Sequence, residues 1–302
     1  MPPFSRVLVP YDGSEPAKAA LTLAIALGKH GASVFITTVV DEIAAIEESA
    51  DGAGIDPSPV MEALDQEGQA RLDEASALCR AAGITPGSKI VHDTPVGGIL
   101  ASLDVQKSEL VIMGTHARDG LARTFLGSTT EGVLRLSRVP VLTVRVADHV
   151  ADMPFATIVV AIDDSEPADA AAALAARLQR DAKATVSAAY AYDTTSLYRN
   201  AGNFGFNPEE LEEEMKDDGA TIVKAALARA KLPADTTVAV VEGEPVAAII
   251  GVAEKAHATL IVTGTHGRRG IRRFMLGSVA EHLVRSSPMP VLVVPVPREA
   301  NA

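Results

Sequence analysis

The sequence predicts an α/β fold of two consecutive, doubly wound, parallel five-stranded sheets of the Rossmann-like type. Short apolar runs alternate with helical patterns along the chain, an order typical of parallel sheets that helices cover on both faces. The second half repeats the first: residues 264–285 match residues 114–135 without gaps at eleven of 22 positions. The 302 residues are enough for two domains that each bury a core. We expect these domains at residues 1–148 and 155–302.

The first half alternates strand and helix patterns with recognisable helix ends. Ser14 is a good N-cap with Pro16 in the first turn, and Gly83 ends a long helical pattern. Residues 41–59 lack a clean period and are predicted to be a surface connection. The predicted strands are 6–9, 33–40, 89–92, 110–113 and 140–146, and the predicted helices are 17–29, 60–82, 95–106 and 128–137.

The second half repeats this order after a short junction within residues 149–155. The turn Asp163-Asp-Ser-Glu-Pro167 matches Asp12-Gly-Ser-Glu-Pro16 at an offset of 151. The predicted strands are 157–162, 185–191, 237–241, 259–263 and 290–294, and the predicted helices are 168–180, 208–231, 245–256 and 278–285.

The composition excludes several classes of protein. A formal net charge of -12 argues against a broad nucleic-acid-binding face. No signal peptide and no apolar run of transmembrane length is visible, so we expect no membrane partner and a cytoplasmic location. The single cysteine, Cys79, lies in a helical pattern and is expected to be a buried structural thiol.

A glycine-rich, basic loop follows the fourth predicted strand of the second half. Arg268, Arg269, Arg272 and Arg273 lie within six residues of an otherwise acidic chain, and a helix begins after the loop. Glycines allow close backbone approach, and the first N–H groups of a helix attract anions. A solvated loop is the alternative for one such pattern, but its occurrence in both halves favours a phosphate site.

Two elements of each half are expected to converge on one ligand site. Asp12 and Asp163 follow the first strand of each half, and the glycine loops follow the fourth. In doubly wound sheets, ligands bind at the carboxyl ends of the strands, where the winding direction switches.

These residues resemble the universal stress protein family in its tandem, ATP-binding form. The opening motif Val7-Leu-Val-Pro-Tyr-Asp-Gly-Ser14 is repeated as Ile158-Val-Val-Ala-Ile-Asp-Asp-Ser165, and the closing motif Pro290-Val-Leu-Val-Val is echoed as Pro140-Val-Leu-Thr-Val. Gly264, Gly267, Gly277 and Ser278 fit the family's pattern of Gly, two residues, Gly, nine residues, then Gly-Ser/Thr.

The resemblance implies an adenine nucleotide, ATP with or without Mg²⁺, as the ligand of each half. It implies that the strand-end residues lie near the adenine, and that the glycine loop and following helix hold the ribose and phosphates. The implied ATP-binding residues are Pro10, Asp12, Val39, Gly114, Arg123, Gly127, Ser128, Ala161, Asp163, Ala191, Gly264, Thr265, Gly267, Arg268, Gly277, Ser278 and Val279.

The first half departs from the pattern at Ala117, which stands where the second half has Gly267. A methyl group there crowds a close ligand, or costs about 1 kcal/mol if the backbone needs a positive φ. Asp119 also replaces Arg269. We therefore expect both halves to bind adenine nucleotide and the second half to bind it more tightly; an empty first half is the alternative.

The sequence supports a catalytic or metal site in these loops less well than a nucleotide-binding site. His116 and His266 have no Cys/His cluster nearby in the sequence that would make a zinc site, and Ser128 and Ser278 lack a nucleophile elbow. No phosphate-binding loop with Gly-Lys-Ser/Thr is present. The favoured function is a nucleotide-responsive stress or regulatory protein, and the alternative is an adenylating or slowly ATP-hydrolysing enzyme.

Two hypotheses concern assembly. The segment 190–206 contains three of the four tyrosines, and it is either an ordinary loop or a mobile flap or contact surface. The family resemblance also implies that the halves pair as an intrachain pseudo-dimer through their last strands, 141–146 and 291–294, which would hide a sheet edge. A further dimer of whole chains is expected.

Overall fold

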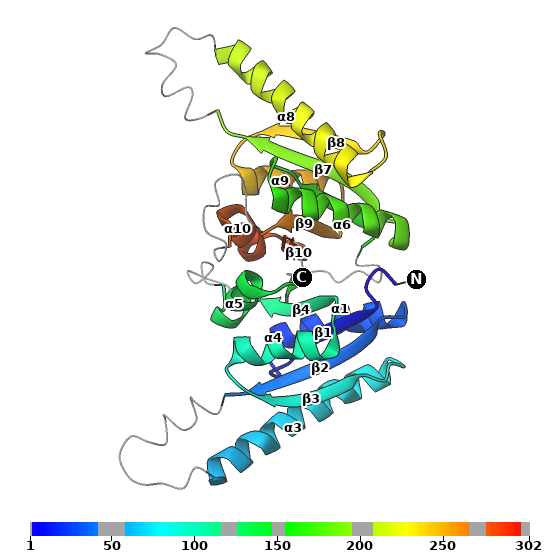
Figure 1. Cartoon of the computed structure of the whole chain (residues 1–302), viewed down its shortest axis with the longest axis vertical. Helices are drawn as coiled ribbons and strands as arrows, with labels where there is room; N and C mark the ends of the chain where they lie inside the picture. The colour runs from blue at the N-terminus through cyan, green and yellow to red at the C-terminus, as the bar shows by residue number, and fades with distance from the viewer. Residues whose placement is uncertain are drawn as a thin grey trace, which may run out of the picture. The chain divides into compact units, whose positions relative to one another are not determined.

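The computed structural model describes residues 2–41, 58–115, 126–146, 155–194, 208–265 and 276–296. The chain divides into two compact units, Met1–Pro154 and Phe155–Ala302. Each unit contains five neighbouring parallel strands with helices packed against them, as Figure 1 shows. The predicted α/β fold of two Rossmann-like sheets is confirmed.

The first unit has the strand order β3-β2-β1-β4-β5, and each neighbouring pair is parallel. The order reverses direction between β1 and β4, which is the switch point of a doubly wound sheet. Its elements are β1 (Arg6–Pro10), α1 (Glu15–Lys29), β2 (Ser33–Val40), α3 (Ser58–Ala81), β3 (Gly87–His92), α4 (Pro95–Gln106), β4 (Leu110–Thr115), α5 (Ser128–Leu136) and β5 (Val141–Arg145).

The second unit has the equivalent order β8-β7-β6-β9-β10, again with parallel neighbours. Its switch point lies between β6 and β9. Its elements are β6 (Thr157–Ala161), α6 (Glu166–Ala182), β7 (Thr185–Tyr192), α8 (Pro208–Ala230), β8 (Thr237–Glu242), α9 (Pro245–Lys255), β9 (Leu260–Gly264), α10 (Ser278–Ser286) and β10 (Val291–Val294).

Helices cover both faces of the first sheet. A Cβ added to Gly68 of α3 would meet Val40, whereas one added to Gly98 of α4 would meet Val39. Successive residues of a strand point to opposite faces, so α3 and α4 lie on opposite faces. Because α1 contacts α3 and α5 contacts α4, each face carries two helices.

The core is aliphatic, as the low aromatic content predicts. The central strands β1, β4, β6 and β9 are nearly continuous runs of buried Val, Leu and Ile, the pattern of strands covered on both faces. Cys79 is buried in α3 as a free thiol, as predicted, and burial raises its pKa. No helix among the described residues is both long and apolar enough to cross a membrane.

The structure describes only the first part, residues 190–194, of the tyrosine-rich segment. Tyr190 and Tyr192 belong to strand β7. Tyr190 packs beside Gly219 of α8, where an added Cβ would lie 2.7 Å from its ring, and Tyr192 is buried. These two tyrosines are therefore part of the fold and not of a flap. Residues 195–206 lie outside the described residues.

Candidate functional site

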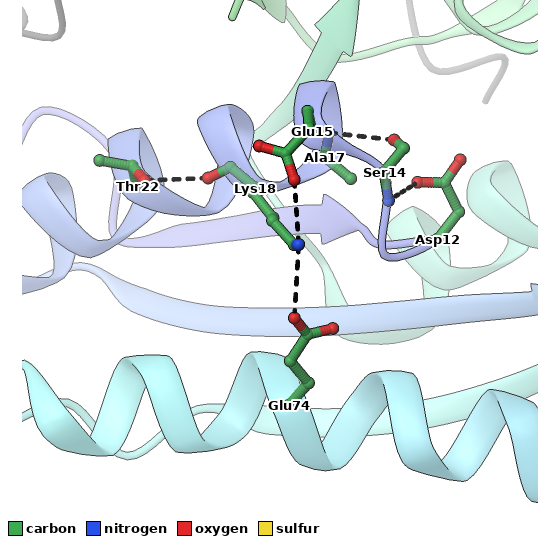
Figure 2. Close-up of polar contacts among 7 residues, drawn as sticks. All are labelled: Asp12, Ser14, Glu15, Ala17, Lys18, Thr22 and Glu74. Atoms are coloured by element: carbon green, nitrogen blue, oxygen red, sulfur yellow. Dashed lines mark hydrogen bonds and ion pairs between the residues drawn. The ribbon is translucent and has the colours of Figure 1, made fainter.

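The turn after the first strand is built by local hydrogen bonds in both units. In the first unit, Oδ1 of Asp12 accepts from the N–H of Ser14 at 3.0 Å, and Ser14 caps α1 by accepting from the N–H of Ala17. Figure 2 shows this turn at the carboxyl end of β1. The cap fixes the start of α1 and holds the Asp12 carboxylate, which is exposed, at the sheet edge.

The second unit has the same turn with one change. Ser165 donates its hydroxyl to Oδ1 of Asp163 at 2.5 Å and caps α6 through the N–H of Ala168. Asp164 has φ of 60°, where Gly13 of the first unit has φ of 79°. Pro10 and Ala161 are the last residues of β1 and β6, so both flank the candidate site.

The first glycine of each loop lies inside a strand and not after it. The sequence predicted strand ends at residues 113 and 263, but β4 runs through Gly114 to Thr115, and β9 runs through Gly264. A Cβ at Gly114 would lie 2.0 Å from the carbonyl oxygen of Pro16, and one at Gly264 would lie 2.5 Å from the carbonyl carbon of Pro167. Both glycines therefore allow the first helix of the unit to pack on the strand.

The helices that follow the loops begin without a side-chain cap. Gly127 and Gly277 are the N-cap residues of α5 and α10, and neither helix has a capping side chain. The other four helices whose preceding residue is described, α1, α4, α6 and α9, are capped by Ser14, Thr94, Ser165 and Glu244. The N–H groups of the first turn are thus left available in α5 and α10.

Hydrogen bonds place these open helix starts at the carboxyl ends of the fourth strands. In the second unit, Gly277 donates its N–H to the carbonyl of Thr265 at 2.7 Å, and Thr265 donates its N–H to Val294 at 3.1 Å. In the first unit, the Thr130 hydroxyl donates to the carbonyl of Gly114 at 3.4 Å. Since β4 pairs with β1 and β9 with β6, the helix starts and the aspartates share one sheet edge in each unit.

The N–H of Gly277 has a partner within the unit. It donates to the carbonyl of Thr265, so it is not among the open donors of the helix start, and its predicted contact with the nucleotide stays a prediction. Ser278 and Val279 follow it in the first turn, and no partner is present for their N–H groups in the described part of the chain. Ser128 holds the same position at the start of α5. The exposed donors of the site are therefore one to two residues beyond the glycine.

The second strands contribute the partly exposed residues Val39 and Ala191. Val39 is the penultimate residue of β2, and its side chain lies close to Gly98 of α4, where an added Cβ would approach it to 2.8 Å. Ala191 holds the equivalent place in β7. Both lie at the same sheet edge as Asp12 and Asp163.

Three of the predicted ATP-binding residues, Arg123, Gly267 and Arg268, lie outside the described residues. So do Ala117, Asp119 and the loop histidines His116 and His266. Among the residues that the structure does describe, no group of three or more His, Cys, Asp or Glu side chains is arranged to hold a metal ion.

One feature of the site was missed by sequence reasoning. Tyr11, directly before Asp12, is only 2% exposed. Burial, together with the carboxylate of Glu74, raises the pKa of Tyr11 far above its usual value. Glu74 also lies 3.6 Å from Nζ of Lys18, which pairs with Glu15 at 3.0 Å (Figure 2). An aromatic residue at a position where the second half has Ile162 was the available signal.

Two hollows among the described residues do not include Asp12, Asp163 or the starts of α5 and α10. One of about 670 Å³ lies between α3 and β3. Another of about 410 Å³ lies at the amino ends of β1, β2 and β3 and includes Ser33, Gly87 and Ser108. The candidate site is therefore defined by strand ends and helix starts.

The fold and its repeated edge define a tandem α/β protein with two doubly wound domains. The universal stress protein family model matches residues 3–145 and 154–295. The chain therefore belongs to the universal stress protein family, with two consecutive family domains.

Individual relatives agree with this assignment. Universal stress protein MJ0531 of Methanocaldococcus jannaschii is 32% identical over 143 residues, which cover 47% of this chain and 82% of that protein. Universal stress protein Rv2005c of Mycobacterium tuberculosis is 28% identical over 209 residues, 68% of each chain. The crystal structure of a universal stress protein from Archaeoglobus fulgidus has a TM-score of 0.70 at 22% identity and covers 96% of this chain and 98% of its own, which supports the fold.

Proposed function

We propose that each unit binds one adenine nucleotide, ATP by preference, at the carboxyl edge of its sheet. The observation that carries this proposal is the contrast between helix starts: α5 and α10 begin at glycines without caps, while α1, α4, α6 and α9 are capped. Open N–H groups and the positive end of the helix dipole favour an anion there. Phosphates would meet Ser278 and Val279 in the second unit and Ser128 in the first.

The other parts of the nucleotide fit the neighbouring strand ends. Adenine would lie beside Asp12, Pro10 and Val39 in the first unit, and beside Asp163, Ala161 and Ala191 in the second. These residues are brought to one edge by the parallel pairing of β2, β1 and β4 and of β7, β6 and β9. The binding edge of a doubly wound sheet lies at its switch point, which is where they lie.

We propose that the second unit binds the nucleotide more tightly. Its loop carries Gly267 and four arginines, whereas the first has Ala117, two arginines and Asp119. Each arginine near a phosphate tail adds an attractive charge, and an aspartate subtracts one. Arg268 and Arg123 are the loop cations that we assign to the phosphates, with Gly114, Gly264, Thr265 and Gly267 shaping the approach. Mg²⁺ would accompany the triphosphate.

We propose a regulatory role in which nucleotide occupancy controls the protein's contacts with partners, in the cytoplasm and as a dimer of tandem chains. The pairing of the two units through their last strands stays a prediction. An adenylating or hydrolysing enzyme is the second function, and no described contact favours it. Assays of phosphate release and of pyrophosphate release, at micromolar protein and saturating Mg-ATP, separate the two: sustained multiple turnover would favour the enzyme.

The decisive variant is Gly277→Asp, with Gly127→Asp as its counterpart in the first unit. The backbone of Gly277 has φ of -67° and ψ of 146°, which an aspartate adopts without strain. Its carboxylate would cap α10, stabilise it by about 0.3 kcal/mol and occupy the donors that phosphate needs. We expect ATP affinity of the second site to fall at least about a hundredfold while thermal stability holds or rises.

Isothermal titration with ATP, ADP and GTP measures this directly. Wild-type protein should show two ATP sites, Gly277→Asp should lose the tighter one, and Gly127→Asp should lose the weaker one. Because both variants add the same charge, each is the control for the other. Wild-type affinity in a stably folded Gly277→Asp variant would overturn the assignment of phosphate to α10.

A further inference from the structure

Among the described strands of the first unit, β3 has a neighbour on one side only. Among the described strands, β3 pairs with β2 only, and Figure 1 shows it at the border of the sheet beside α3. The N–H of Asp93 donates to the carbonyl of Val40 at 3.2 Å. In a parallel strand, the N–H and C=O groups of one residue point to the same side, and those of the next residue point to the opposite side. The backbone groups of Lys89 and Val91 therefore point toward β2, as those of Asp93 do. The backbone groups of Ser88 and Ile90 point outward.

A hollow of about 670 Å³ runs along this edge, between β3 and the first half of α3. We call it the α3–β3 groove. Its apolar part is formed by Met61 and Ile90, and its polar part by Glu62, Asp65 and Gln69, with His92 at the end of the strand. Oδ1 of Asp65 lies 3.2 Å from Nε2 of His92. The described residues that line the groove include no lysine or arginine, so its formal charge is negative.

We propose that the α3–β3 groove binds an extended, basic peptide segment of a partner protein, which adds a strand to the edge of β3. The outward backbone groups of Ser88 and Ile90 would supply main-chain hydrogen bonds, as in other cases of strand addition. Side chains of the added strand alternate between faces. Those on the α3 side would place cations against Glu62 and Asp65 and apolar groups against Met61 and Ile90.

The charge of the groove decides between possible occupants. A second copy of this chain would bring the same Glu62 and Asp65 to the interface, and like charges placed together are unfavourable. A basic peptide places opposite charges there and gains from the partial burial of the pair. The observations therefore favour a basic partner over self-association.

The equivalent edge of the second unit is different. Gly68 packs under β2 and β3 as Gly219 packs under β7 and β8, which aligns α3 with α8 at an offset of 151. At this offset Asp65 corresponds to Lys216. In the neighbouring strand, Glu242 ends β8 as His92 ends β3, and it accepts a hydrogen bond from Thr194. The other groove positions of α3 remain or become acidic in α8: Ser58, Met61, Glu62 and Gln66 correspond to Glu209, Glu212, Glu213 and Asp217. The second unit therefore lacks the apolar Met61, and the combination of an apolar and an acidic part distinguishes the groove of the first unit.

The test uses the full chain and fluorescence anisotropy with three labelled eight-residue peptides. The first repeats Lys-Thr-Val-Thr, so that Lys and Val alternate along one face of the strand (the Lys-Val peptide). The second has Glu in place of Lys, and the third has Pro in place of Thr, which keeps the charge but lacks half of the backbone donors. We expect the Lys-Val peptide to bind at least tenfold more tightly than either of the others.

Two variants localise the binding. Glu62→Gln with Asp65→Asn removes two groove charges, and Ser88→Pro removes an outward N–H, which a proline on an edge strand tolerates. Each should weaken the Lys-Val peptide at least tenfold. Asp181→Asn with Glu254→Gln, at exposed positions of α6 and α9, makes the same change in net charge and should leave binding unchanged.

The contrary results are equally specific. Equal weakening by the Asp181→Asn, Glu254→Gln pair would mean that the peptide follows net charge only. Unchanged binding by Ser88→Pro would mean that no strand is added; either result overturns the proposal. Self-association that Ser88→Pro abolishes, seen by sedimentation without peptide binding, would assign the edge to a second copy and overturn it as well. Circular dichroism confirms that each variant is folded.

Discussion

In each unit an ion pair joins the first helix to the long helix after the second strand, but the positions of the positive and negative residues are exchanged between the units. In the first unit the cation is on the first helix: Lys18 of α1 lies near Glu74 of α3. In the second unit the carboxylate is there: Asp169 of α6, equivalent to Lys18 at the offset of 151, accepts two hydrogen bonds from Arg229 of α8, at 2.8 and 2.7 Å. The same backbone arrangement is thus compatible with either polarity.

What both units keep is informative. Each has an aspartate beside a first helix that a serine caps, and a glycine in the fourth strand. In each, the last helix begins at a glycine and has no capping side chain. The ion pairs between the helices can differ from one unit to the other, because exposed ion pairs contribute little to stability. The shared features are those that the fold and the proposed nucleotide site require.

The largest expected effect comes from the glycines in the fourth strands. An alanine at position 114 would place Cβ 2.0 Å from the Pro16 carbonyl oxygen, and one at 264 would lie 2.5 Å from Pro167. Overpacking against backbone costs about 3 kcal/mol, so we expect Gly114→Ala to lower the free energy of unfolding by about that amount and Gly264→Ala by somewhat less. Urea unfolding followed by circular dichroism measures both.

Gly251→Ala is the matched control for these variants. Gly251 lies within α9, and an added Cβ would meet nothing within 4 Å. Alanine is the better helix former by about 1 kcal/mol, so this variant should be stabilised. A Gly114→Ala variant as stable as the wild type would show that α1 is not held against β4 as described.

The next effect is a pH dependence confined to the first unit. Burial and the nearby carboxylate of Glu74 raise the pKa of Tyr11 above its usual value of 10.0. Below pH 10 the tyrosine is protonated in both the folded and the unfolded chain, so its contribution is complete. Above pH 10 the unfolded chain loses the proton first, and stability falls as the pH rises.

Tyr11→Phe isolates this contribution. Between pH 9 and pH 11 the wild type should lose about 1 kcal/mol more of its unfolding free energy than Tyr11→Phe does. Urea midpoints at the two pH values provide the comparison, in which all other titrating groups cancel. Equal losses in both proteins would mean that Tyr11 titrates normally.

A smaller effect concerns the turns that follow β1 and β6. Gly13 has φ of 79° and Asp164 has φ of 60°, a region that alanine adopts at a cost of about 1 kcal/mol and that asparagine tolerates better. We therefore expect Gly13→Ala to destabilise the protein by about 1 kcal/mol and Gly13→Asn by less than half of that. Thermal unfolding ranks the two, and an alanine variant at least as stable as the asparagine variant contradicts the backbone argument.

The smallest effect is that of the exposed pair in the second unit. Arg229 and Asp169 form a bidentate pair with 47% and 35% of their side chains exposed, and such pairs contribute about 0.5 kcal/mol. A double-mutant cycle with Arg229→Ala and Asp169→Ala should give a coupling energy of this size that disappears in about 1 M salt. A coupling energy that salt leaves unchanged would contradict a screened surface pair.

Sequence reasoning predicted nearly all of the fold. The alternation of periods located every described strand and helix, and several bounds, such as Ser33–Val40 and Pro95–Gln106, coincide with the prediction. Strand ends were less accurate near Gly114 and Gly264, because a glycine after an apolar run resembles a loop start. Only the packing of Pro16 and Pro167 shows why those residues lack a side chain.

The candidate site was predicted in part. The sequence located the glycines and the serines after them, but not which N–H groups remain available, since the bond from Gly277 to Thr265 is a tertiary contact. It also missed the burial of Tyr11, because a single aromatic residue after a strand has no period that would indicate which way it points. The α3–β3 groove joins side chains from a helix and a strand, and no single motif records it.

The central claim is that the two open helix starts hold adenine nucleotides, and the direct measurement is the nucleotide content of the protein. We would denature purified protein of known concentration and quantify the released nucleotides by chromatography, before and after saturation with ATP. We predict between one and two adenine nucleotides per chain at purification, two after saturation, and one fewer in Gly277→Asp. No released nucleotide together with no binding of added ATP would contradict the claim.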